Sequence, residues 1–100
     1  MHDIRIRYRF SSTPWRYAGQ SGWVFVTLPS KLSREIRKTF RPDEAGWGRL
    51  SVIANIRNTE WKTAIWFDTK ANAYLLPLKA SIRAKEDIRT GERIAVTLIL

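Results

Sequence analysis

Short runs in which apolar and polar residues alternate are the feature that most constrains how this chain can fold. Residues 4–10 alternate arginines with isoleucines and aromatic residues, and residues 49–57 and 93–100 alternate in the same way. Successive side chains of a β-strand point to opposite faces, so each run predicts a strand with one apolar face.

Three further runs, residues 23–28, 61–67 and 73–76, are rich in aromatic and β-branched residues. Each is bounded by Gly, Pro, Asn or Asp, the residues that favour turns. They predict three more strands, and the first of them is apolar on both faces, as expected of a central strand.

A helix is predicted after Pro29, because three apolar residues then recur at four-residue spacing: Leu32, Ile36 and Phe40. Pro42 ends this pattern, since the residue before a proline disfavours helical geometry. A second, shorter helix is predicted over residues 79–85.

Six short strands separated by turns predict an all-β fold with minor helix. Closure into a barrel would leave no apolar strand with a free edge. The motif Leu-Pro-x-Lys-x-Ser occurs twice, at residues 28–33 and 76–81, which suits a pseudo-twofold barrel. We expect one domain over residues 1–100, a small six-stranded β-barrel flanked by one or two short helices.

The sequence has no Cys, and its one His is His2. Disulfides, thiolate nucleophiles and Cys-ligated zinc are thereby excluded, and a His at the terminus is a poor candidate for a base or a ligand. A small domain without disulfides favours an intracellular protein, and the first residues lack the apolar run of a signal peptide. We expect a cytoplasmic protein with no metal, no cofactor and no membrane association.

No catalytic motif is evident. Residues 19–22 lack the Lys of a phosphate-binding loop, and there is no nucleophile elbow. Two pairs of carboxylates, Asp43–Glu44 and Glu86–Asp87, are chain neighbours whose side chains point apart, and we interpret them as solvated loop residues. The sequence thus predicts a binding module without catalytic residues. A hydrolase would need carboxylates that the fold brings together.

The formal net charge of +9 and the pI of about 10.7 indicate a positive field that attracts phosphates. Two rows of cations are candidates for a phosphate or nucleic-acid contact. One lies on a single face of the first predicted strand and the other on the predicted helix: Arg5, Arg7 and Arg9, and Lys31, Arg34, Lys38 and Arg41. The alternative is an ordinary solvated surface, and the sequence does not say whether the two rows share one side of the domain.

Five Trp residues are many for 100 residues. Trp buries a large area, so these residues can simply fill the ends of a barrel. Alternatively, four of them line a cleft for a small ligand or a protein: Trp15, Trp23, Trp47 and Trp61. Weak nucleic-acid binding and binding in a Trp-lined cleft are therefore the two functions that the sequence leaves open.

Six segments along the chain are distinctive when they are taken together: residues 22–29, 52–56, 61–63, 74–79, 82–83 and 91–96. Their resemblance is to the domain of unknown function DUF1905 family, and it runs from about residue 10 to residue 98. It implies a compact β-barrel with short helices and no known reaction. Asn58 and Asn72 stand where the family often has Gly, and Asn tolerates the left-handed geometry of such turns.

A fainter resemblance concerns residues 76–83 and 88–94, which are similar to the strand–Pro–helix–Gly–strand unit of swapped-hairpin transcription regulators and antitoxins. In those proteins two chains interleave to form one DNA-binding barrel. The resemblance implies that one chain holds both halves here, and the oligomeric state stays open.

Overall fold

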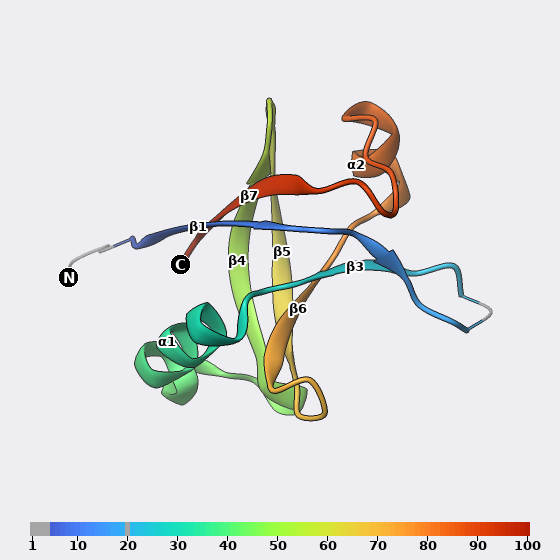
Figure 1. The fold of residues 1–100 in the computed structure, drawn as a ribbon. Helices are drawn as coiled ribbons and strands as arrows, with labels where there is room; N and C mark the ends of the chain where they lie inside the picture. Colours follow the sequence, from blue (N-terminus) through green and yellow to red (C-terminus); the bar gives the residue numbers. More distant parts are fainter. Residues whose placement is uncertain (1–4, 20) are drawn as a thin grey trace.

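The structure of the chain is a computed structural model that describes residues 5–19 and 21–100, the side chain of Trp47 excepted. The described residues form seven β-strands in one antiparallel sheet, together with two α-helices (Figure 1). The elements in chain order are β1 (Arg7–Ser12), β2 (Trp15–Arg16), β3 (Val24–Thr27), α1 (Ser30–Phe40), the 3₁₀ turns η1 (Arg41–Asp43) and η2 (Gly46–Gly48), β4 (Arg49–Ile56), β5 (Thr59–Asp68), β6 (Ala73–Pro77), α2 (Ala80–Lys85) and β7 (Ile94–Ile99).

The hydrogen-bonded order of the strands is β1-β7-β4-β5-β6-β3-β2. The long β4–β5 hairpin joins the two halves of the sheet, because β4 pairs with β7 near one end and β5 pairs with β6 near the other. Figure 1 shows this hairpin running across the direction of β1, β7 and β3. The sheet is therefore strongly curled, and it forms a half-barrel.

The prediction of six strands is wrong, and the difference lies around Pro14. The first strand continues past Phe10 to Ser12, and after two residues the chain resumes as β2 at the opposite edge of the sheet. Proline has no N–H to give to a ladder, so the strand breaks there. The Ser12 hydroxyl donates to the carbonyl of Thr27 at 2.8 Å. The N–H of Gly91 donates to the carbonyl of Pro14 at 3.0 Å. One short stretch of chain thus supplies both edge strands and connects them.

The core lies on the concave face of the sheet, where the alternation predicts it. In β4 and β7 the predicted inward residues are buried and the residues between them are more exposed. The buried residues of these two strands are Leu50, Val52, Ala54, Ile56, Ile94, Val96, Leu98 and Ile99. Burying a side chain of the Val, Leu or Ile type is worth about 1.5–3 kcal/mol, so this face dominates the stability of the fold.

Helix α1 closes one end of the core, as its apolar stripe predicts. Ile36 is fully buried, and Leu32 and Phe40 are partly buried against the core. The buried Ser33 hydroxyl accepts the N–H of Tyr74 at 3.0 Å, which fixes the helix to β6. Figure 1 shows α2 at the other end of the molecule. Neither helix of the described residues is long and apolar enough to cross a bilayer.

The two Leu-Pro motifs lie side by side, because β3 and β6 pair in antiparallel register. The N–H of Leu28 donates to the carbonyl of Tyr74, and that of Leu78 donates to the carbonyl of Val24, both at 2.9 Å. Each strand is then followed by a helix. This pairing accords with two related halves, whose twofold relation stays a prediction.

The two asparagine turns differ from each other. Asn72 has a φ of 52°, so it adopts the left-handed geometry expected of it. At the β4–β5 turn the positive φ of 54° falls on Arg57 instead of Asn58, because Ile56 already pairs with Thr59 and the loop is one residue earlier than predicted.

Candidate functional site

An open groove of about 1050 Å³ lies on the outer face of the sheet, over β2, β3, β6, β5 and β4. Its floor is built from outward positions, which alternate with the buried positions of the same strands. We call this surface the aromatic groove and define its floor by six residues: Trp15, Trp23, Phe25, Trp66, Leu75 and Pro77. Paired strands bring these residues together, with Trp15 opposite Phe25 and Phe25 opposite Pro77.

Three rings form one end of the groove. The ring centroids of Trp15 and Phe25 are 5.3 Å apart, and those of Trp23 and Phe25 are 5.8 Å apart with only 10° between the ring planes. The indole N–H of Trp15 donates to the Thr27 hydroxyl at 2.9 Å, which fixes the innermost ring. Trp23 is the outermost ring and is 53% exposed. Trp23 thus stacks on Phe25, Trp15 is tilted by 37° against the same ring, and this trio presents the indole of Trp23 to solvent.

Trp66 forms a second aromatic position on β5 and is 39% exposed. It pairs with Leu75 on one side and with Arg49 on the other. Strand β6 separates it from the trio, so two strand spacings of about 4.8 Å place the two aromatic positions about 10 Å apart or more. The groove therefore offers two distinct ring surfaces.

Cations outnumber acids among the charged residues that line the groove. Arg49, Lys79 and Arg83 contribute three positive charges, and Asp68 contributes one negative charge. The guanidinium of Arg83 donates through Nε to the carbonyl of Leu78 at 3.1 Å, so its position is fixed by the backbone. The groove thus combines an apolar floor with a positive edge.

The structure places the four predicted Trp residues differently. Trp15 and Trp23 line the aromatic groove, whereas Trp61 packs against the core and does not line it. The side chain of Trp47 lies outside the described part of the structure. Sequence reasoning missed Trp66. This residue is an even number of positions from the charged residues Glu60 and Lys62 of the same strand, so its side chain points to the same outer face.

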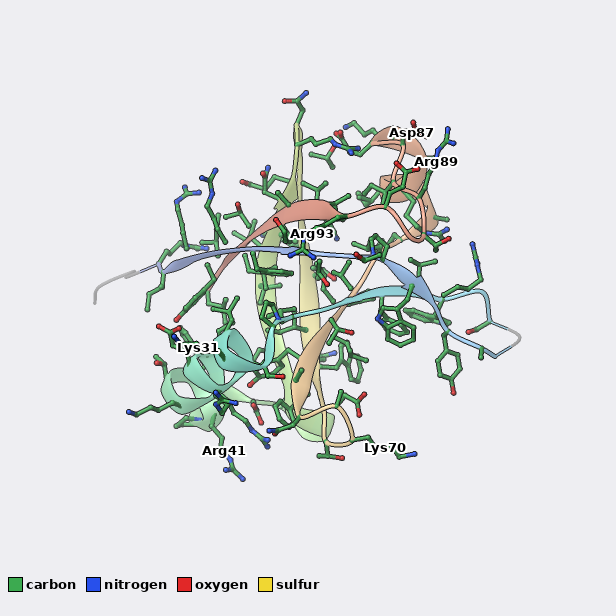
Figure 2. The ribbon with its side chains drawn as sticks, viewed as in Figure 1. Lys31, Arg41, Lys70, Asp87, Arg89 and Arg93 are labelled. Carbon is green, nitrogen blue, oxygen red and sulfur yellow. The ribbon has the colours of Figure 1, made fainter. Side chains whose placement is uncertain are left out.

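The two predicted cation rows are exposed but do not line the aromatic groove. The strand row, Arg5, Arg7 and Arg9, lies on and just before β1, where Arg7 pairs with Ile99 of β7. The helix row is Lys31, Arg34, Lys38 and Arg41 on α1 and at the start of η1. Figure 2 shows Lys31 and Arg41 at the α1 end of the molecule. The cations at the groove are a third group, which the sequence did not single out.

The interpretation of Asp43–Glu44 as a solvated pair is wrong for Glu44, which is largely buried. Its side chain is 9% exposed, and it accepts a hydrogen bond from the buried Tyr74 hydroxyl. Arg37 lies with Nε 3.6 Å from the same carboxylate and with its guanidinium carbon 3.7 Å from the centre of the Phe67 ring. Burial, and then the hydrogen bond to Glu44, raise the pKa of Tyr74 well above its ordinary value, so the hydroxyl stays a donor. This cluster joins α1 and η1 to the sheet.

Glu86 is also held by the fold. Its carboxylate accepts the Thr59 hydroxyl, and its backbone carbonyl accepts the Arg57 guanidinium, which ties the end of α2 to the β4–β5 turn. Asp43 and Asp87, the chain neighbours of the two glutamates, are exposed. Within the described residues, no three side chains of the His, Asp and Glu types gather where they could hold a metal ion.

The fold and the groove define a small antiparallel half-barrel domain with an open aromatic surface on its convex side. Residues 10–98 match the family described as domain of unknown function DUF1905, and the chain belongs to that family. The matched range is the one over which the sequence resembles the family, so that prediction is confirmed. The comparison with curated proteins gives no match.

Proposed function

We propose that this domain is a non-enzymatic binding module, and that its site is the aromatic groove. The observation that carries the proposal is the exposure of Trp23 and Trp66 on one groove with a cationic edge. Large apolar surfaces that stay exposed on a soluble domain generally mark interaction sites. The ligand class that fits combines a flat ring, which covers an indole, with a negative charge.

Covering an indole gains about 25 cal/mol for each Å² of apolar surface removed from water. The cations decide the sign of the ligand's charge. Arg49, Lys79 and Arg83 outnumber Asp68 at the groove, and the net charge of +9 adds a long-range attraction for anions. A neutral ring would use only the floor, and an inorganic anion only the edge. A ligand with both features uses both.

Isothermal titration with adenosine monophosphate, adenosine and inorganic phosphate tests the proposal. Adenosine monophosphate is expected to bind more tightly than either of the other two, because it alone offers a ring and a charge. Trp66→Ala is expected to weaken this binding by about tenfold, within the range of single stacking contacts.

Ile6→Ala is the matched control, because Ile6 is an exposed apolar residue outside the groove. It should leave the affinity unchanged. Equal affinities for the wild type and Trp66→Ala, or no binding of any of the three probes, would contradict the proposal.

A further inference from the structure

We propose that the natural ligand of the aromatic groove is a single-stranded nucleic acid, with one unpaired base on Trp23, another on Trp66, and phosphates beside Arg49 and Lys79. The inference rests on the proposed function, and it names the polymer whose repeating unit supplies both the ring and the charge.

The spacing of the two ring surfaces is the first reason. Trp66 and the Trp15–Phe25–Trp23 trio are about 10 Å apart or more, because β6 lies between β5 and β3. One small ring cannot cover both surfaces, whereas a chain that carries rings at intervals can. A duplex cannot do so, since its base faces are already stacked on each other, whereas unpaired bases readily stack on aromatic side chains.

The second reason is that each ring surface has its own cation. Arg49 pairs with Trp66 across β4 and β5, on the same outer face of the sheet. Lys79 follows Pro77 by two residues, and Pro77 pairs with Phe25 of the trio. A ring next to a positive charge therefore occurs twice along the groove. This repeat suits a polymer in which rings and phosphates alternate along the chain.

The shape and the overall charge are the third reason. The groove is open and runs over five strands, so a polymer can enter and leave it. The excess of nine positive charges favours a polyanion over a proline-rich peptide, which would use the rings and leave the cations unused. A second copy of this chain carries the same net positive charge, which makes it a poorer electrostatic match than a polyanion.

The test measures binding of labelled oligouridylates of one to about eight nucleotides, a length range that includes the smallest site sizes known for such grooves, at about 50 and 200 mM salt. The affinity is expected to rise at least tenfold from one to four nucleotides and then to level off. It should fall with salt and exceed that for a duplex of the same length by tenfold or more. Trp66→Ala should weaken binding by about tenfold.

Two double variants separate the groove from the general charge, because both remove two cations. Arg49→Ala with Lys79→Ala is expected to weaken binding and to lower the salt slope by about one or more. Arg7→Ala with Arg9→Ala, on the outer face of β1, should change both quantities much less. Circular dichroism and thermal unfolding verify that each variant is folded. Equal losses in the two double variants would overturn the inference.

Other outcomes separate this inference from the proposed function. Adenosine monophosphate can bind in a Trp66-dependent way while the affinity does not rise with oligonucleotide length. In that case the nucleic-acid ligand is refuted, and the aromatic groove remains the binding site. If neither probe binds, both fail. Trp66-dependent binding of a decaproline peptide without oligonucleotide binding would assign the groove to a peptide. A dimer in sedimentation that Trp66→Ala abolishes would assign it to a second copy.

Discussion

Removing the hydroxyl of Tyr74 tests how α1 and η1 are joined to the sheet. Tyr74→Phe keeps the buried ring, which lies edge-on to Phe67 at 5.1 Å, and deletes only the donor to Glu44. The Glu44 carboxylate is then left with little solvent contact. Arg37 does not replace the lost donor, since its Nε lies 3.6 Å away.

The expected cost is about 2 kcal/mol of unfolding free energy, because hydrogen bonds to charged groups contribute about 1.5–3 kcal/mol. In a domain of this size each kcal/mol shifts the midpoint of thermal unfolding by about 4–8 °C, so Tyr74→Phe should lower it by roughly 8–16 °C. Urea and thermal unfolding followed by circular dichroism measure both quantities.

Tyr17→Phe is the matched control, because it deletes the same atom from a side chain that is 53% exposed. It should cost less than about 0.5 kcal/mol, as surface substitutions usually do. A double-mutant cycle with Glu44→Gln isolates the coupling between the two side chains. If Tyr74→Phe were no more destabilising than Tyr17→Phe, the hydroxyl would not hold the cluster together, and the assigned role would be refuted.

Three further predictions concern stability. Burial raises the pKa of Tyr74 above its ordinary value of 10.0. The contribution of this shift to the free energy of unfolding is therefore complete below pH 10 and is lost as the pH rises towards the folded pKa. Urea midpoints should fall above about pH 10, and they should fall less steeply in Tyr74→Phe. Gly22 has a φ of 70°, so Gly22→Ala should cost about 1–2 kcal/mol, whereas Gly46→Ala, whose new methyl group meets no atom within 4 Å, should cost much less; similar losses would contradict this reasoning. Leu76 is fully buried, so chemical denaturation of Leu76→Ala should show a loss of about 2–5 kcal/mol, and a loss below 1 kcal/mol would place it outside the core.

The period-two patterns predicted the strands and their inward faces, because a half-buried strand must alternate. They worked best for β4 and β7, which bury every second residue over most of their length. They missed β2, because two residues carry no periodicity. Pro14 indicates a break in the strand, because proline has no N–H for the ladder. However, a strand that breaks and moves to the other edge of a sheet has the same local sequence as one that ends in a turn.

The candidate site was harder to predict, since it depends on which strands become neighbours. The outward parity of Trp66 was available from Glu60 and Lys62, but nothing local indicates that β6 lies between β5 and β3. Arg49 belongs to the groove only because its strand pairs with that of Trp66. The pairing of β3 with β6, in contrast to that hairpin, joins residues far apart in the chain, and short-range patterns do not encode it.

The pairing of β1 with β7 has a consequence for how the domain is made. Arg7 pairs with Ile99, so the strand of this sheet that is synthesised first has as its ladder partner the strand that is synthesised last. Pairings between such distant segments form slowly, because a long loop must be closed before any contact is gained. Until β7 emerges, β4 has an open edge and β1 has no partner strand. The arginines of β1 then discourage this unpaired strand from adding to another chain, since charged side chains on an edge strand oppose such pairing.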